Sequence, residues 1–230
     1  MSEVVIITGG TKGLGRAAVK KWLGEGWRVA TCARDEADLA RTEEELNNPN
    51  LFTQALDISD TNAVHGFVER VLGRWSAIDV LINNAGILGP RETIEEYSED
   101  VWRKVIEINL NGAFYFVKAA LRPMLEADSG VIINVSSGAG MKGKKRWGAY
   151  AASKFALEGF TQVLRDELLD SHIRVHAFDP GAMRTDMRRV AYPNEDPTRN
   201  SSPEKVAHML YDIACVYEPT MVRLAASDYF

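Results

Sequence analysis

Short apolar segments rich in β-branched residues alternate with longer segments of helical periodicity along most of this chain. The alternation is typical of βαβ units, in which helices join parallel strands and cover the sheet. Strands of such a sheet are buried on both faces, so they are apolar throughout. We therefore predict an α/β fold with a doubly wound parallel sheet of about seven strands and helices on both faces. The predicted strands are residues 4–8, 27–32, 51–55, 78–83, 130–135 and 173–178, with a weaker seventh at 221–225, and the predicted helices lie near 14–24, 35–47, 60–73, 99–126, 148–170 and 203–216.

Length and composition are those of an ordinary globular protein. The 230 residues fit one domain, 1–230, and a hydrophobic content of 46% supplies a large core. The net charge of -5 argues against a nucleic-acid partner. An apolar run begins at Val4, which leaves no room for a secretion signal, and no apolar stretch reaches the roughly 18 residues of a membrane span. We expect a cytoplasmic protein without a membrane partner.

Cysteine and histidine usage predicts no metal site. Cys32 and Cys215 share no metal-like spacing and fall in a predicted strand and a predicted helix, which favours reduced core residues. The four histidines lack a shared ligand spacing.

Residues 184–202 interrupt the alternation. The segment is rich in Arg, Pro, Asn and Asp and poor in apolar residues, which predicts a long surface loop. Loops of this length inside a compact domain are often lids, and a disordered insertion is the alternative.

A glycine-rich loop follows the first predicted strand directly. Its sequence is Thr8-Gly9-Gly10-Thr11-Lys12-Gly13-Leu14-Gly15, and a predicted helix comes next. This arrangement exposes backbone N–H groups at a helix N-terminus to a pyrophosphate, and the glycines let the backbone approach the ligand. A bare tight turn is the alternative, but the position at the first strand-to-helix turn favours a nucleotide site.

Tyr150 and Lys154 stand four residues apart in a predicted helix, and Ser137 lies thirteen residues before the tyrosine. A spacing of four places the phenol and the ammonium on one helix face. A nearby ammonium favours phenolate and draws a tyrosine pKa of about 10 toward the working pH, as a general acid or base requires. The same pair also arises by chance on solvated helix faces.

These motifs together resemble the short-chain dehydrogenase/reductase family in its short, single-domain form. The resemblance runs from Val4 to about Asp186. It implies a Rossmann-like fold and an oxidoreductase that transfers a hydride between a nicotinamide cofactor and a carbonyl or alcohol. The motifs that carry it, in the family's order and approximate spacing, are Thr8-Gly9 through Gly15, Asp57-Ile58, Asn83-Asn84-Ala85-Gly86, Asn109, Ser137, Tyr150 with Lys154, and Pro180-Gly181 through Thr185.

The resemblance assigns most of the cofactor contacts. The glycine loop is expected to hold the pyrophosphate, and an aspartate with its apolar neighbour the adenine ring. Small residues after the fourth strand are expected to pack against the cofactor, and a Pro-Gly segment to hold the nicotinamide carboxamide. We also expect the Asn84 amide to tie neighbouring strands together. The residues concerned are Gly9, Thr11, Lys12, Gly13, Leu14 and Gly15 in the loop, then Asp57 and Ile58, then Asn84, Ala85 and Gly86, and finally Pro180, Gly181, Met183 and Thr185.

The end of the second predicted strand bears on which cofactor is bound. A carboxylate there normally grips the adenosine ribose of NAD, whereas a nearby arginine accommodates the 2′-phosphate of NADP. Ala33 stands at the family's acidic position, Arg34 follows, and Lys12 adds a second cation. These residues favour NADP(H) over NAD(H). Asp35 would select NAD if the register were shifted by two residues, and Arg34 as a solvated cation is the alternative reading.

The resemblance also assigns the catalytic roles. Tyr150 is the general acid/base, and Lys154 lowers its pKa and binds the nicotinamide ribose. Ser137 hydrogen-bonds the substrate oxygen; its neighbour Ser136 is the rival, but Ser137 has the family spacing. Asn109 holds a water beside the lysine in a proton relay, or is a satisfied buried amide.

The substrate class is only outlined by the sequence. Four cations in residues 140–147, with Arg184, Arg188 and Arg189 in the predicted lid, lead to the hypothesis of an anionic carbonyl or alcohol substrate, against the alternative of a solvated rim. An NADP(H)-binding sensor without turnover is the alternative function, and a related epimerase or dehydratase is a further rival. On analogy we expect a homodimer or homotetramer, although the C-terminal ending departs from the family's glycine-rich turn.

Overall fold

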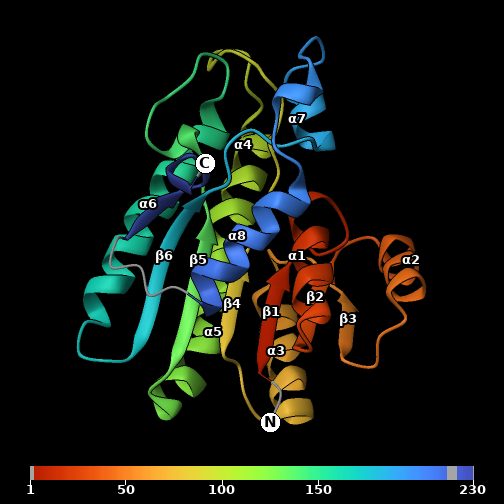
Figure 1. Cartoon of the computed structure of the whole chain (residues 1–230). Helices are drawn as coiled ribbons and strands as arrows, with labels where there is room; N and C mark the ends of the chain where they lie inside the picture. Colours follow the sequence, from red (N-terminus) through yellow and green to blue (C-terminus); the bar gives the residue numbers. More distant parts are fainter. Residues whose placement is uncertain (1–2, 217–221, 230) are drawn as a thin grey trace.

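The computed structural model describes residues 3–216 and 222–229. Within them seven strands form one sheet in the order β3-β2-β1-β4-β5-β6-β7, and every pairing is parallel. The predicted doubly wound sheet is confirmed, and residue 221 of the seventh predicted strand lies outside the described residues. The strands, shown in Figure 1, are β1 (Val4–Thr8), β2 (Arg28–Ala33), β3 (Leu51–Ala55), β4 (Val80–Asn83), β5 (Gly130–Val135), β6 (Ile173–Asp179) and β7 (Arg223–Ala225).

Helices cover both faces of the sheet. On one face α1 (Gly13–Gly24) packs against α8 (Pro203–Cys215), and both lie in front of the strands in Figure 1. The opposite face carries α3 (Thr61–Trp75), α5 (Gly112–Ala127) and α6 (Gly148–Glu167), whereas α2 (Glu36–Leu46) lies beside β2 and β3 at the sheet edge. Three layers therefore enclose two apolar cores.

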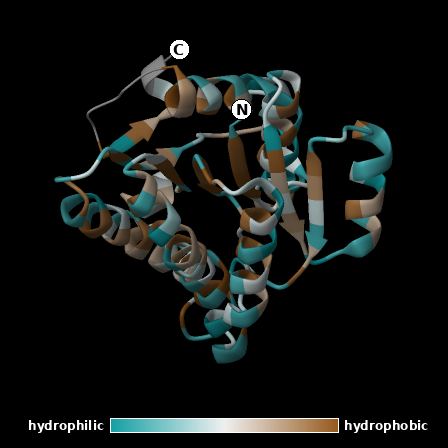
Figure 2. Ribbon diagram, turned by 90° about the horizontal axis from the view of Figure 1, so that it is seen from below, coloured by the Kyte–Doolittle hydropathy of each residue, from teal (hydrophilic) through white to brown (hydrophobic). Residues whose placement is uncertain are grey.

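Alternation along the strands divides side chains between those cores. Val5 and Ile7 of β1 point to the core under α1 and α8, whereas Val4 and Ile6 point to the core under α3 and α5. All four are fully buried, as a strand covered on both faces requires. The strands in Figure 2 accordingly carry much hydrophobic colour between helices whose outer faces are largely hydrophilic.

The order of the strands creates a crevice. β1 has β2 on one side and β4 on the other, so the chain reverses its direction across the sheet at β1. In open parallel sheets, ligands bind beyond the carboxyl ends of the strands at such a reversal. The fold thus fixes where a site is expected.

The predicted helix 99–126 contains a π turn. It is observed as α4 (Glu99–Ile106), a π-helical turn at Glu107–Asn111, and α5. The turn lets the buried Asn109 side chain reach the backbone of Ile87, and Gly112 packs where an added Cβ would lie 2.9 Å from the Ile58 side chain. The predicted helical segment is therefore present over its whole length, and the π turn inside it was not predicted.

The predicted surface loop 184–202 also contains regular structure. Thr185 caps the helix α7 (Asp186–Ala191) by accepting a hydrogen bond from Arg188 N at 3.2 Å, and a 3-10 turn follows at Pro197–Arg199. The Arg188 guanidinium binds Glu195 with Nε to Oε2 at 2.6 Å. A short capped helix and a half-buried ion pair thus replace the expected irregular loop.

Helix starts follow the sequence elsewhere. Asp60 caps α3 by accepting from Asn62 N and Ala63 N, and Ser202 caps α8 by accepting from Lys205 N. In the described ranges 3–216 and 222–229, no helix combines the length and apolarity needed to cross a bilayer.

Candidate active site

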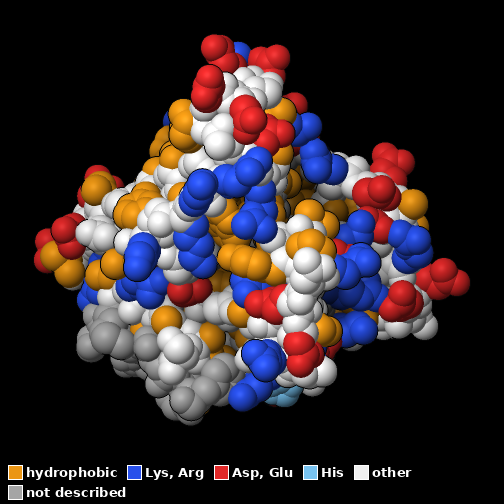
Figure 3. Space-filling view, turned by 90° about the horizontal axis from the view of Figure 1, so that it is seen from above, with side chains coloured by type: hydrophobic (Ala, Val, Ile, Leu, Met, Phe, Trp, Pro, Cys, Tyr) orange, Lys and Arg blue, Asp and Glu red, His pale blue; other side chains and the backbone are white. Residues whose placement is uncertain are grey.

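A continuous cleft of about 1190 Å³ opens beyond the carboxyl ends of the strands. Figure 3 looks down on this end of the molecule, where Lys and Arg side chains surround a hollow with hydrophobic side chains in it. Two of the predicted site residues, Gly15 and Asn109, do not line the cleft. Those that do are Gly9, Thr11, Lys12, Gly13, Leu14, Arg34, Asp57, Ile58, Asn84, Ala85, Gly86, Ser137, Tyr150, Lys154, Pro180, Gly181, Met183 and Thr185.

The glycine loop has the steric form of a phosphate cradle. Gly9 and Gly13 have φ values of +72° and +52°, which favour glycine. A Cβ on Gly15 would lie 2.2 Å from the Gly9 carbonyl oxygen, so no other residue fits there. Helix α1 begins at Gly13 without a side-chain cap, so its first N–H groups face the cleft. These features fit a dinucleotide pyrophosphate.

Asn84 joins the glycine loop to β4. Its Nδ2 donates to Thr8 O at 2.9 Å, and its backbone N donates to Thr8 Oγ1 at 3.0 Å. The strand-tying role expected of this amide is therefore present.

The sheet edge at β2 carries cations and one capping carboxylate. Ala33 ends the strand, Arg34 is exposed at the cleft, and Lys12 Nζ lies 2.5 Å from Asp38 Oδ2. Asp35 caps α2 by accepting from Asp38 N at 2.9 Å. Its carboxylate is therefore engaged in the cap, which argues against the shifted register in which Asp35 would select NAD. No carboxylate occupies the end of β2, so the site fits a phosphate on the ribose.

Asp57 is held at the end of β3 as a carboxylate. Its Oδ1 accepts hydrogen bonds from Ser59 N at 3.0 Å and Ser59 Oγ at 2.7 Å. Burial, the largest influence, acts to raise the pKa of Asp57, but these bonds and the nearby Arg34 bring it below its ordinary value.

The predicted catalytic side chains converge at the ends of β5 and α6. Tyr150 is 8% exposed, and its phenol is hydrogen-bonded to the Ser137 hydroxyl. Ser136 points elsewhere: its hydroxyl donates to Glu158 Oε1 at 2.5 Å. The geometry therefore favours Ser137 over Ser136 as the serine that faces a ligand.

Lys154 lies under the tyrosine and is 5% exposed. Its Nζ donates to Val135 O at 2.8 Å and lies 5.8 Å from the centre of the Tyr150 ring. Burial lowers the pKa of Lys154 to about 8, while the Glu158 carboxylate opposes that shift. The ammonium is thus held in an environment that disfavours charge.

The pKa of Tyr150 differs in direction from the prediction. Burial raises it, the Ser137 hydrogen bond acts to lower it, and the Asp179 carboxylate acts to raise it. The expected lowering by Lys154 is not found, because desolvation of the phenolate outweighs the favourable contacts. The ammonium is turned toward Val135 O.

Both amide atoms of the Asn109 side chain are hydrogen-bonded to the protein. Its Oδ1 accepts from Ile87 N at 2.8 Å, and its Nδ2 donates to Ile87 O at 2.9 Å and Ser153 Oγ at 3.0 Å. A Cβ on Gly86 would lie 3.1 Å from Asn109 Oδ1 and 3.8 Å from Lys154 Nζ, so the amide oxygen and the ammonium flank this glycine. Of the two predicted roles, the satisfied buried amide is present.

An apolar wall, formed by Leu88 and the rings of Trp147 and Tyr192, lies beside Tyr150 and was not predicted. The Trp147 ring centre is 5.5 Å from that of Tyr150 and 5.9 Å from that of Tyr192. Leu88 and Tyr192 pack on this cluster, and all three line the cleft. Leu88, Trp147 and Tyr192 come from three segments that lie far apart in the sequence, so no local sequence pattern could predict that they meet.

The predicted cations divide into two groups. Arg184, Arg188 and Arg189 line the cleft. Residues 141–146 are exposed and are not among its lining residues, and Lys144 Nζ lies over the Trp147 ring, 5.3 Å from its centre. Any cationic influence on a ligand therefore comes first from the lid.

The family model for short chain dehydrogenases matches residues 3–196. Because this covers most of the chain, the protein belongs to the short-chain dehydrogenase/reductase family, a class of oxidoreductases. The predicted resemblance and the Rossmann-like fold are confirmed.

Among similar proteins is the uncharacterised oxidoreductase YciK of Escherichia coli K12, which is 33% identical over 209 residues, covering 89% of this chain and 82% of YciK. A short chain dehydrogenase of Shigella flexneri 2a, solved in complex with NADP, is 31% identical with a TM-score of 0.88, over 97% of this chain and 95% of that one. Another, from E. coli CFT073 in complex with NADPH, is 32% identical with a TM-score of 0.85, over 92% and 90% of the two chains.

Proposed function

We propose that this protein is an NADP(H)-dependent oxidoreductase that reduces a carbonyl or oxidises the corresponding alcohol, with Tyr150 as general acid/base. The observation that carries the proposal is that Ser137, Tyr150 and Lys154 line the same cleft as the glycine loop. When bound, the nicotinamide cofactor supplies or accepts the hydride. No feature of residues 3–216 or 222–229 favours the alternative of a sensor.

The residues of the cleft fit NADP(H) from end to end. The N–H groups at the start of α1 would hold the pyrophosphate, and Arg34 with Lys12 would bind the 2′-phosphate. Pro180, Gly181, Met183 and Thr185 line the same cleft after β6, where they would hold the carboxamide. The NADP and NADPH in the two similar structures support this choice of cofactor.

The protein's part in the chemistry is to manage a proton. Tyr150 would donate it to the substrate oxygen in reduction and accept it in oxidation. The Ser137 hydroxyl, already bonded to the phenol, would stabilise charge on that oxygen. The Lys154 ammonium would bind the ribose, with Asn109 fixing the backbone of Ile87 nearby. The second lone pair of Asn109 Oδ1 would hold the water that completes the relay.

The substrate end of the cleft favours an apolar body with an anionic group. Trp147, Tyr192 and Leu88 provide apolar surface next to Tyr150. Arg184 pairs with no carboxylate among the described residues, whereas Arg188 is held by Glu195. We therefore assign the anionic group to Arg184, with residues 184–202 acting as a lid.

The outer faces of α5 and α6 support a homodimer. Phe114 and Phe155 are 42% and 45% exposed, and Val163 is 57% exposed. The Phe114 and Phe160 rings meet edge to face at 6.1 Å, so the two helices share one apolar strip. This strip is where we place the contact between subunits.

A substrate panel tests the function. NADPH and NADH oxidation would be followed with ketones, aldehydes and keto acids, for wild type and Tyr150→Phe. We expect NADPH to be preferred, keto acids to be reduced faster than their neutral counterparts, and the variant to lose roughly 1000-fold in kcat while still binding NADPH. Cofactor consumption that Tyr150→Phe leaves unchanged would refute the mechanism.

A further inference from the structure

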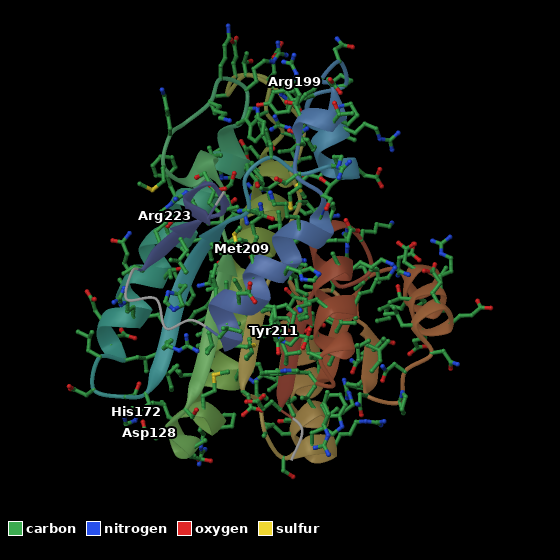
Figure 4. The ribbon with its side chains drawn as sticks, in the orientation of Figure 1. Asp128, His172, Arg199, Met209, Tyr211 and Arg223 are labelled. Carbon is green, nitrogen blue, oxygen red and sulfur yellow. The ribbon has the colours of Figure 1, made fainter. Side chains whose placement is uncertain are left out.

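A buried network of charged groups links the catalytic helix to the last strand of the sheet. Glu158 lies one helical turn after Lys154 and is 4% exposed. Its Oε1 accepts hydrogen bonds from Ser136 Oγ at 2.5 Å and from Arg223 Nε at 3.2 Å. Arg223 lies on β7, beside β6 and α6 (Figure 4). The network therefore reaches the back of the site from a strand about 65 residues later in the chain.

The second arm of Arg223 fixes the turn after β6. Its Nη2 donates to Asp179 Oδ2 at 2.9 Å, and Asp179 Oδ1 accepts from Gly181 N at 3.0 Å. Gly181 has a φ of +68°, and the segment it begins lines the cleft. One guanidinium thus holds both the carboxylate beside the catalytic lysine and the carboxylate that shapes this turn.

Close packing fixes the position of Glu158. A Cβ on Gly140 would lie 2.9 Å from Lys154 O, 3.0 Å from Ser136 Oγ and 3.1 Å from Glu158 Cγ. The turn that follows Ser137 therefore closes directly over this carboxylate. Because there is no room for it to move away, its charge stays near Lys154.

Burying the charged Glu158 side chain costs free energy of folding. A buried ion pair seldom stabilises a fold more than well-packed apolar side chains of similar size. Here the negative charge lies one turn from an ammonium that burial disfavours, and it acts to keep that ammonium protonated. Arg223 opposes this effect because it neutralises Glu158.

We propose that Glu158 and Arg223 are positioning residues, of which Glu158 sustains the charge of Lys154 while Arg223 moderates that effect and holds the Asp179 turn. The inference rests on the proposed function, since it is in carbonyl reduction that the ammonium is needed.

The charged groups near Lys154 come from several elements. Glu107 of the neighbouring π turn is turned to Asn111 and Tyr115. The remaining groups are Tyr150 and Glu158 on α6, Asp179 on β6 and Arg223 on β7. Glu158 and Arg223 carry opposite charges, so neutralising each of them is expected to shift the pKa of Lys154 in opposite directions.

The test measures the titration of Lys154 directly, in the full chain and without turnover. Lysine labelled with carbon-13 at Cε would be followed by NMR across pH, and the Lys154 signal assigned by its loss in Lys154→Met. Glu158→Gln keeps an acceptor for Ser136 but removes the charge, so we expect the Lys154 pKa to fall by about one unit. Arg223→Gln removes the opposing charge and should raise it by a smaller amount, whereas Arg223→Lys should stay near wild type.

Matched controls separate charge from general disturbance. Glu167→Gln removes a carboxylate from the exposed end of the same helix, and Arg174→Gln removes an arginine of β6 that donates to Ala214 O. Neither substitution should shift the pKa of Lys154. If Arg223→Gln does not fold, Glu158→Gln alone decides the question.

Two outcomes would overturn the proposal: a Lys154 pKa unchanged in Glu158→Gln, or shifts of the same sign in Glu158→Gln and Arg223→Gln. Failure of the proposed function is seen separately, because it would appear as wild type that reduces no carbonyl in the panel while the lysine still titrates.

Discussion

The two ends of the cleft are made of different material. At the cofactor end the walls are backbone: Gly9 and Gly13 have positive φ values, and Gly15 leaves no space for a side chain. At the substrate end the walls are side chains, with Trp147 and Tyr192 packed ring against ring. A backbone wall fails when one carbon is added, whereas a side-chain wall changes shape when one ring is replaced. The difference teaches that cofactor binding tolerates little variation here and that substrate choice is adjustable.

The sharpest test of the backbone wall is Gly15→Ala. The added Cβ would lie 2.2 Å from Gly9 O and 2.5 Å from Asn84 Nδ2, so the loop must shift. We expect NADPH affinity, measured by fluorescence titration, to fall by more than about 100-fold, which is roughly 3 kcal/mol. Gly24→Ala is the matched control, because a Cβ there meets nothing within 4 Å. Equal NADPH binding by both variants would remove the distinction between the two ends.

Lys154, where the two ends meet, is expected to reduce the stability of the fold. Its pKa is about 8 in the folded protein against an ordinary 10.5, so the unfolded chain binds more protons between these values and stability rises with pH across this window. Below pH 8 the buried charge costs roughly 3 kcal/mol. Lys154→Met should therefore unfold at higher urea concentration than wild type at pH 7, while losing activity.

The stability gain of Lys154→Met should shrink as the pH approaches 10.5. Lys104→Met, which removes an exposed lysine of α4, should show no such pH-dependent gain. A Lys154→Met variant less stable than wild type at pH 7 would show that the hydrogen bond to Val135 O outweighs the cost of burial.

The smallest effect is expected at the side-chain wall. Trp147→Leu removes the ring that packs beside Tyr150 and keeps an apolar surface. We expect KM for a bulky aromatic carbonyl to rise about fivefold, KM for a small aliphatic one to stay nearly constant, and NADPH affinity to remain unchanged. A loss of NADPH affinity would show that the two ends are coupled.

The sequence predicted those features of the fold that steric constraints determine, namely the buried strands and the glycine loop. The bounds of β1 and β5 are those expected, because strands buried on both faces must be apolar and are ended by polar or glycine residues. The glycine loop was found for the same reason, since a backbone approaching a phosphate excludes side chains.

What escaped prediction depends on contacts between distant segments. Glu158 and Arg223 are 65 residues apart, and either alone is an ordinary charged residue in a helix or strand. The helix α7 has too few apolar residues to show periodicity, and it is held by Thr185 and by the pairing of Arg188 with Glu195. The direction in which the Tyr150 pKa is shifted also depends on burial, and a spacing of four residues does not predict how buried the phenol is.

The π turn at Glu107–Asn111 has a consequence for how related chains are compared and engineered. Such a turn holds one more residue than an α-helical turn, so α4 and α5 are out of step by one residue. Removing any one residue of this turn would let the two helices join smoothly. The repaired helix would carry Asn109 away from Ile87, so a chain one residue shorter would lose an active-site support at no evident cost to its helix.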